Sequence, residues 1–128
     1  MEIRVVGGDI TQSDADAIVV NLFDGVRQPG GATGAVDRAL DGAISGLIAD
    51  GEVTGKKGQM ALLHTLGKLP AKRVLVVGLG KSQDFNEDIV RDVTAESCRY
   101  LRRTGVERAA TIAHGAGIGG QEGEAAAR

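Results

Sequence analysis

Two glycine-rich segments are the parts of this chain whose residue types could bind a phosphate. The first, GLGKS, covers residues 78–82 after an apolar run. A phosphate-binding P-loop would need a glycine five positions before Gly80, and that position is Leu75. A dinucleotide-binding fingerprint would need a third glycine where the chain has Gln83. The glycines are therefore interpreted as a sharp turn off a buried strand.

The second segment, GAGIGG at residues 115–120, meets the dinucleotide spacing G-x-G-x-x-G in full. That fingerprint also needs a following helix, a further strand and an acidic residue about twenty positions on. Only residues 121–128 follow, and they are helix-prone. We expect no nucleotide site here, and we interpret residues 121–128 as the start of a connecting helix.

The residues that could bind a metal or act as a nucleophile are few and scattered. His64, His114 and Cys98 stand far apart in the sequence, without a second ligand at metal spacing. We interpret His64 as a structural residue of an apolar strand. Cys98 falls on or beside the apolar stripe of a helix, where a nucleophile is not expected. The arginines at positions 99, 102 and 103 suit a helix C-terminus better than a phosphate patch. We therefore predict no catalytic residue and no metal ligand in this chain.

Composition sets the class of protein. A chain of 128 residues is one domain by length and can bury a core without a metal or disulfide. The formal net charge is −2, with acids and bases interspersed, so we expect neither nucleic acid nor a membrane as a partner. The single cysteine cannot form an internal disulfide, and the N-terminus lacks the apolar run of a signal peptide. A cytoplasmic location is predicted.

Aliphatic runs and glycine exits predict five strands. The run at Arg73–Val77 is apolar on both faces, which is typical of a strand near the middle of a parallel sheet. The other predicted strands are Glu2–Val6, Asp16–Phe23, Gln59–Leu66 and Arg108–His114. The core must be built from aliphatic side chains, because aromatic residues make up only 2% of the chain.

Helical spacing of apolar residues predicts two amphipathic helices. The first starts at a Thr33 cap and ends before Gly51, and Gly42 and Gly46 within it are expected to mark close contact with a neighbouring element. The second starts at an Asn86 cap and ends at Gly105. Together with the strands, they predict an α/β fold, a three-layer sandwich around a largely parallel or mixed five-stranded sheet.

Three segments resemble the N-terminal domain of the cytosolic leucyl aminopeptidase family. They are residues 16–25 (DAIVVNLFDG), residues 51–59 (GEVTGKKGQ) and, above all, residues 72–81 (KRVLVVGLGK). The resemblance covers almost the whole chain. It implies a macrodomain-like domain over residues 1–120, followed by residues 121–128 leading to a catalytic domain absent from this chain.

In that family the catalytic domain holds two divalent metal ions, zinc or manganese, and the subunits form a hexamer. The resemblance therefore implies a non-catalytic accessory role, with the chain's own catalytic domain and like subunits as partners. It implies no cofactor bound by this chain itself. A catalytic segment of the type Asn-Thr-Asp-Ala-Glu-Gly-Arg, which a complete family member would contain, is absent from the sequence.

A second resemblance is to ADP-ribose-binding macrodomains, through residues 8–11 (GDIT), 16–19 (DAIV) and 30–37 (GGATGAVD). It implies a candidate ADP-ribose-type cleft. Two asparagines of those macrodomains would fall at Val20 and Phe23, and Asn21 is one place off, which turns its side chain to the other face of the strand. The residues of this candidate cleft are Asp9, Asn21, Gly30, Gly31 and Gly34.

Three functions therefore remain to be weighed. The first is a non-catalytic aminopeptidase domain, the second is a binding module for ADP-ribose or a related nucleotide, and the third is a free-standing enzyme. A two-metal hydrolase needs several carboxylates gathered at bridging distance, so the third is the least favoured.

Overall fold

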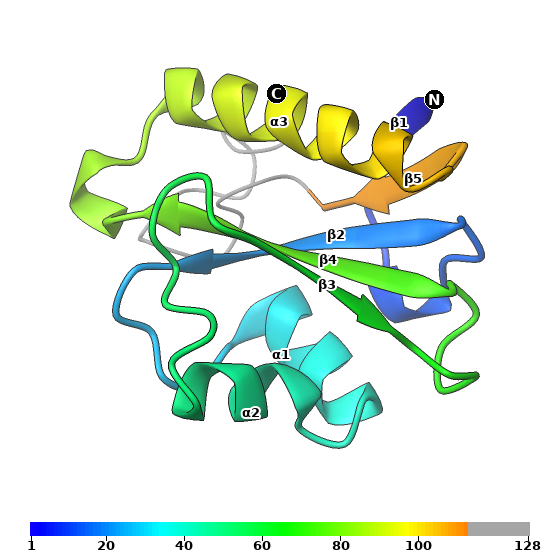
Figure 1. The fold of residues 1–128 in the computed structure, drawn as a ribbon, viewed down its shortest axis with the longest axis horizontal. Coiled ribbons are helices and arrows are strands. Elements are labelled where there is room, and N and C mark those ends of the chain that lie inside the picture. The colour runs from blue at the N-terminus through cyan, green and yellow to red at the C-terminus, as the bar shows by residue number, and fades with distance from the viewer. Residues whose placement is uncertain (113–128) are drawn as a thin grey trace.

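The computed structural model describes residues 1–112, and within them it shows a five-stranded sheet with helices on both faces (Figure 1). The strand order is β1-β5-β2-β4-β3. Strands β1, β5, β2 and β4 run parallel, and β3 runs antiparallel to β4. The bounds are β1 Glu2–Val5, β2 Ala17–Phe23, β3 Met60–His64, β4 Arg73–Gly80 and β5 Arg108–Thr111. The predicted three-layer α/β fold with a mixed, largely parallel sheet is confirmed.

The centre of the sheet is formed by β2 and β4. All seven residues of β2 are buried, as are the residues of β4 from Val74 to Leu79. Their side chains alternate between two helix layers, which explains why both strands read as continuous apolar runs. The run at Arg73–Val77 is an interior strand as expected, although β2 is the middle strand and β4 lies next to the β3 edge.

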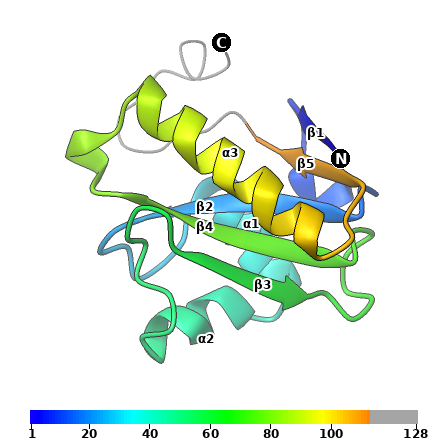
Figure 2. The same ribbon diagram turned by 45° about the horizontal axis from the view of Figure 1, so that its top comes forward.

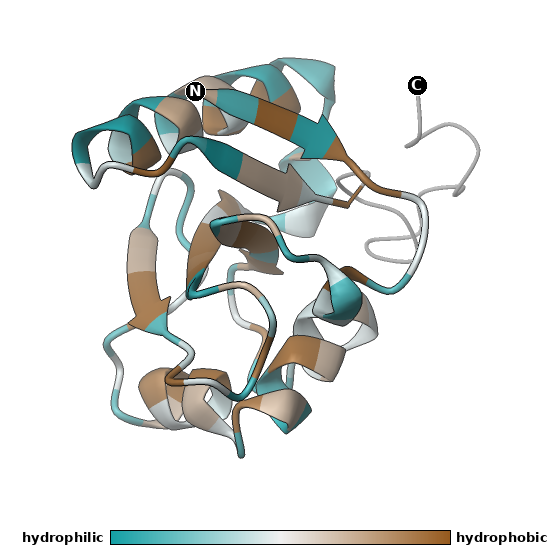
Figure 3. Cartoon of the chain, turned by 90° about the vertical axis from the view of Figure 1, so that its right-hand side faces the viewer, coloured by the Kyte–Doolittle hydropathy of each residue, from teal (hydrophilic) through white to brown (hydrophobic). Residues whose placement is uncertain are grey.

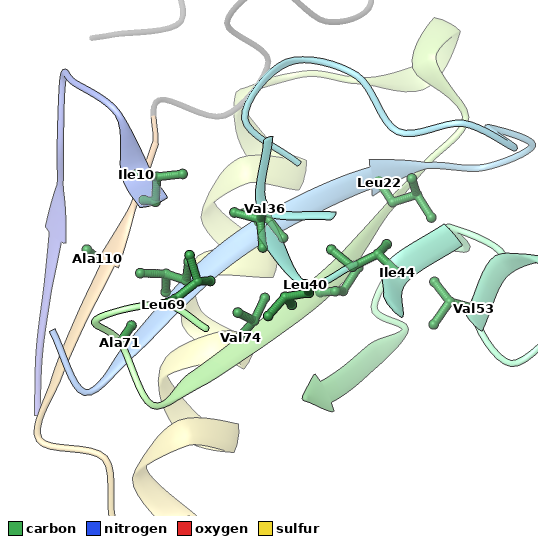
Figure 4. Packing of buried hydrophobic residues seen from close by; sticks show 13 residues of the cluster. Ile10, Leu22, Val36, Leu40, Ile44, Val53, Leu69, Ala71, Val74 and Ala110 are labelled. Carbon is green, nitrogen blue, oxygen red and sulfur yellow. The ribbon is translucent and has the colours of Figure 1, made fainter. Parts of the chain in front are cut away.

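The helices α1 (Gly31–Ala39) and α2 (Ala43–Ala49) cover one face, and α3 (Glu87–Arg103) covers the other (Figures 1 and 2). On the first face, Val36, Leu40 and Ile44 pack against side chains of β2 and β4 (Figure 4). On the second face, Val93 and Leu101 pack against the alternate residues of the same strands. The core is therefore two aliphatic layers separated by one sheet.

The two edge strands differ in hydropathy. Along β1 the charged residues Glu2 and Arg4 alternate with Ile3 and Val5 (Figure 3). The other edge, β3, has the sequence MALLH and contains no acidic, lysine or arginine residue. Charged residues on an edge strand oppose the addition of a further strand, so only the β1 edge has that protection.

The single helix predicted from Thr33 to Gly51 is two helices. Asp41 and Gly42 both have positive φ angles, 57° and 84°, and this left-handed pair breaks the hydrogen-bonding of a continuous helix. The expectation that Gly42 and Gly46 mark close packing is also wrong, because a Cβ at either position would meet nothing within 4 Å. Gly51, with a φ of 78°, does end the helical region as predicted.

The start of the first helix also differs from the prediction. Gly30 is the N-cap of α1, and Thr33 lies in its first turn. The hydroxyl of Thr33 instead donates a hydrogen bond of 2.7 Å to the backbone carbonyl of Asn21 in β2. Thr33 therefore fastens α1 to the central strand rather than capping the helix.

The helix α3 follows its prediction closely. The side chain of Asn86 accepts a hydrogen bond of 3.0 Å from the backbone N–H of Ile89, as an N-cap should. Two acids stand in the first turn and two arginines in the last, which complements the helix dipole. Gly105, with a φ of 83°, lies just beyond the end of the helix.

The loop of residues 52–59 crosses the carboxyl ends of β2 and β4, and its backbone packs directly against the backbone of these strands. Gly78 lies inside β4 rather than in a turn, and a Cβ on it would stand 2.8 Å from the carbonyl carbon of Gly55. A Cβ on Gly55 would likewise stand 2.8 Å from the backbone nitrogen of Asp24. Of the two glycines interpreted as a turn off the strand, only Gly80, with a φ of 81°, fits that interpretation.

Backbone hydrogen bonds hold this crossing together. The N–H of Gly78 donates to the carbonyl of Gln59 at 2.7 Å, and the N–H of Gly80 donates to the carbonyl of Gly55 at 2.9 Å. The side-chain oxygen of Gln59 accepts from the N–H groups of Thr54 and Gly55, at 2.7 and 3.0 Å. The loop is thus an integral part of the sheet end.

We predict that Gly78→Ala destabilises the fold by about 3 kcal/mol, because its methyl group would have to displace backbone atoms of Gly55 and Lys56 in the 52–59 loop. The matched control is Gly46→Ala, an exposed helical position with open space around it, which should gain about 0.5 to 1 kcal/mol. Urea denaturation of the two variants gives these free energies. Equal unfolding midpoints for the two variants would contradict the proposed close approach.

Asp16 links two strands that are far apart in the sequence, β2 and β5. Its carboxylate accepts hydrogen bonds from the backbone N–H groups of Glu107 and Arg108, at 3.1 and 3.0 Å. These hydrogen bonds, with that of Arg108 the larger, lower the pKa of Asp16 below its usual 3.8. Asp16 thereby fixes the start of β5 beside the start of β2.

The lowered pKa predicts how stability depends on pH. Because the folded pKa lies below the unfolded one, the carboxylate's contribution is complete above pH 3.8 and is lost as the pH falls through the folded value. Asp16→Ala should therefore unfold at lower urea than wild type near pH 7, and the gap should narrow toward about pH 2. The exposed neighbour Asp14 supplies the control, Asp14→Ala. A gap that widens as the pH falls would disprove this account.

Candidate functional site

The candidate ligand region lies at the carboxyl edge of the sheet, where ligands bind most α/β proteins. Strands β1, β5, β2 and β4 are parallel, so all four end at this edge. The segment after β1 holds Asp9, and the segment after β2 leads to the glycines that begin α1. The topology thus brings both predicted motifs to one edge of the sheet.

Asp9 begins the short helix η1 (Ile10–Gln12). Its Oδ1 accepts hydrogen bonds from the hydroxyl and the backbone N–H of Thr11, at 2.6 and 3.0 Å. These two hydrogen bonds, the first being the larger, lower the pKa of Asp9 and keep it ionised. The carboxylate is exposed and has a second oxygen, so it can still accept a hydrogen bond from a ligand.

Asn21 is 1% exposed, deep in the middle strand. Side chains alternate along a strand, and Val20 and Leu22 belong to the layer under α1 and α2. Asn21 therefore shares the α3 face with Val19, which belongs to the opposite layer. From the sequence, Asn21, one residue after Val20, is expected to point to the opposite face of the strand, and this alternation of side chains agrees with that expectation.

The three glycines of the second motif have different roles. Gly30 and Gly31 are exposed, and a Cβ on either would meet nothing within 4 Å. Gly34 is buried, and a Cβ on it would stand 2.6 Å from the carbonyl oxygen of Pro29. Gly34 is therefore required for packing of the loop, whereas Gly30 and Gly31 leave open space at the start of α1.

Two of the predicted site elements meet. The helix η1, which Asp9 caps, packs against α1, which Gly30 caps. Asn21 reaches the same helix through its backbone carbonyl, which accepts a hydrogen bond from the hydroxyl of Thr33. The side chains at Val20 and Phe23 are 0% and 4% exposed, and the Phe23 ring packs edge-on against Phe85 at 5.3 Å. Both side chains belong to the core.

A cavity that sequence reasoning missed lies near the same edge. It has a volume of about 480 Å³ and lies between the residues that follow β2, the helix α2 and the start of the 52–59 loop. Asp24 and Arg27 are polar residues on its wall, and Ile48 and Val53 are apolar ones. Because three separate segments form its wall, no local sequence motif could have predicted this cavity.

The other chemistry-bearing residues are dispersed. His64 is exposed at the end of the edge strand β3, and Cys98 is a half-buried free thiol on α3. His114 and the glycine segment 115–120 lie outside the described residues. In residues 1–112, no three or more His, Cys, Asp or Glu side chains gather where they could hold a metal ion. No helix in that range is long and apolar enough to cross a membrane.

Residues 19–128 match the family model described as "Cytosol aminopeptidase family, N-terminal domain". The chain is 35% identical over 114 residues to a probable cytosol aminopeptidase of Geobacter sulfurreducens, a match that covers 89% of this chain and 23% of the relative. It is also 35% identical over 99 residues to a probable cytosol aminopeptidase of Alkaliphilus oremlandii, covering 77% and 20%. The chain therefore spans less than a quarter of the length of these relatives.

Solved structures show the same fold. The macrodomain of Mycobacterium tuberculosis DarG superimposes with a TM-score of 0.72 at 22% identity, covering 98% of this chain and 84% of the macrodomain. An Oceanobacillus iheyensis macrodomain with ADP gives 0.71 at 17% identity, covering 95% and 68%. A mutant tomato leucine aminopeptidase gives 0.68 at 16% identity, covering 96% of this chain and 24% of that one. At these identities the likeness establishes a macrodomain-like fold.

The matched family model and the two relatives lead to one conclusion. The chain belongs to the cytosol aminopeptidase family, as its N-terminal domain.

Proposed function

We propose that this chain is a non-catalytic domain of a leucyl-aminopeptidase-like metallopeptidase, with a structural and oligomerisation role. The observation that carries the proposal is that the matched relatives are about four times as long as this chain, while residues 1–112 gather no metal-binding group. A peptide hydrolase of the two-metal type needs several carboxylates within bridging distance. Such a site belongs to a further domain rather than to this one.

The proposed partners are that catalytic domain and like subunits in a hexamer. The catalytic domain would hold two divalent ions, zinc or manganese, which supply the nucleophilic water and polarise the peptide carbonyl. The compact sheet end built around Gly55 and Gly78 suits a rigid support. The descriptions of the relatives support a cytoplasmic location.

We predict that the 128-residue chain alone releases no chromophore from a leucine p-nitroanilide substrate above the blank, with either manganese or zinc. The reason is that the two histidines and one cysteine of the sequence are too few and too scattered for a closed or catalytic metal site. The control is a complete family member under the same conditions. Release by this chain that a chelator abolishes would overturn the proposal.

The oligomerisation role is tested on the complete family member. Deletion of the region equivalent to residues 1–120 should reduce the oligomer measured by light scattering, while the metal content of the catalytic domain is retained. An unchanged hexamer would remove oligomerisation from the role of this domain.

A second candidate function is binding of ADP-ribose or a related nucleotide, in the region of Asp9, Asn21, Gly30, Gly31 and Gly34. The observation in its favour is that η1 packs against α1, with the exposed Asp9 capping the one and the open Gly30 capping the other. The first-turn N–H groups of α1 could receive a phosphate oxygen. Against specific affinity, Val20 and Phe23 offer no polar group to a ribose hydroxyl.

We predict that ADP-ribose binds no tighter than about millimolar. Each unpaired ribose hydroxyl costs roughly 1 to 3 kcal/mol, so two such losses weaken a micromolar ligand by about a hundredfold or more. Isothermal titration calorimetry measures the constant, with Asp9→Ala as the test and Asp14→Ala as the control. A low-micromolar constant that only Asp9→Ala weakens would favour the binding-module function.

A further inference from the structure

The outer edge of β3 presents backbone groups that the sheet leaves unused. Thr65 donates its N–H to Lys72, and Gln59 accepts from Gly78, so the odd-numbered residues of this strand pair with β4. In an antiparallel pair the intervening residues point their N–H and C=O groups the other way. Met60, Leu62 and His64 therefore direct their backbone groups outward. Within residues 1–112 no further strand lies on this edge.

A groove runs beside this edge on the α3 face. The ion pair of Lys57 with Asp92, at 3.4 Å, places the first half of α3 beside the start of β3. Arg73, opposite His64 in the sheet, donates to the carbonyl of Thr104 at 2.8 Å, so the end of α3 lies beside the end of β3. The groove has a volume of about 420 Å³ and is lined by Gly58, Met60, Glu96, Arg99, Tyr100 and Arg103.

The charge in this groove is mainly positive. Arg99 and Arg103 are exposed, and among residues 1–112 neither forms an ion pair. They stand one helical turn apart, about 6 Å along the axis. Alternate side chains on one face of an extended strand are about 6.6 Å apart. Two acidic side chains at positions i and i+2 of a strand therefore match the two arginines in spacing.

We propose that the β3 edge and this groove bind an extended peptide from a partner protein, which adds as a sixth strand. Residues of the added strand opposite Met60, Leu62 and His64 face α3, and these positions are acidic, to meet Arg99 and Arg103. The intervening residues share a face with the half-buried Ala61 and Leu63 and are apolar. The ligand is thus a strand of alternating acidic and β-branched residues.

The same geometry disfavours a second copy of this chain as the occupant. The β3 strand itself contains no acidic residue, so it cannot complement the arginines. Two-fold pairing of β3 with its copy would instead bring the arginine-bearing grooves of both copies to one side-by-side interface. The proposal concerns this edge alone and holds whether or not the domain acts as an accessory to a catalytic domain.

The test is fluorescence polarisation of the 128-residue chain with a labelled peptide, Val-Asp-Val-Glu-Val-Asp-Val. We expect a dissociation constant on the order of 10–100 µM, as for a short strand with exposed ion pairs. Arg99→Glu with Arg103→Glu should weaken binding about tenfold or more. The matched control is Arg91→Glu with Arg102→Glu, which makes the same charge change on α3 outside the groove and should leave binding nearly unchanged.

Two further measurements test the strand pairing itself. Leu62→Pro removes an outward N–H, a change that an edge strand tolerates, and should abolish binding while circular dichroism stays native. A peptide N-methylated on the residues that face β3 should also fail to bind, with the protein unaltered. Absence of binding, equal weakening by both charge-reversal pairs, or retained binding of the methylated peptide would each overturn the proposal. A peptide-independent dimer in light scattering would assign the edge to a second copy instead.

Discussion

The structure depends on close backbone-to-backbone packing of the 52–59 loop against the carboxyl ends of β2 and β4. Gly55 and Gly78 lie so close that neither leaves room for a side chain, and Gly80 turns the chain away just beyond them. Close packing without side chains lets N–H and C=O groups of the loop and both strands satisfy one another. The loop therefore joins the ends of β2 and β4 through main-chain hydrogen bonds, in addition to the burial of Val53 in the core.

This construction shapes what the domain offers to a ligand. In α/β proteins the carboxyl edge of the sheet is the usual ligand region, but part of this edge is occupied by the 52–59 loop. The remaining polar groups are either tied locally, as Asp9 is to Thr11, or placed on the α3 face, as the buried Asn21 is. At the carboxyl edge of this macrodomain-like sheet, several polar groups are thus engaged within the domain itself.

The sequence predicted the parts of the fold where one physical signal dominates. The runs 16–23 and 73–80 are apolar on both faces, and only interior strands of a covered sheet explain that pattern. The Asn86 cap and Gly105 likewise set the ends of α3 because each acts locally. The break between α1 and α2 was missed because Gly42 was interpreted as a packing position within one helix, and no pattern in the sequence distinguished that role from a left-handed turn at Asp41 and Gly42.

The candidate site was less predictable than the fold. Strand periodicity assigns Asn21 and Val20 to opposite faces, in keeping with the opposite core layers of Val19 and Val20. The role of Gly78 was mistaken because a glycine inside a strand and a glycine in a turn look the same in sequence. The cavity between Asp24 and Thr54 and the groove beside β3 each combine segments distant in the chain, and no short motif encodes such a combination.

The position of β5 has a consequence for how the domain is made. Because β5 lies between β1 and β2, these two strands, which come before it in the chain, share no hydrogen bonds with each other. The sheet can close only when β5, about ninety residues further along the chain than β2, inserts between them. The hydrogen bonds of Asp16 with the N–H groups of Glu107 and Arg108 can form only at that stage. Such a non-local closure is slow compared with local helix formation, so the pairing of β1 and β2 with β5 is expected to form later than the helices.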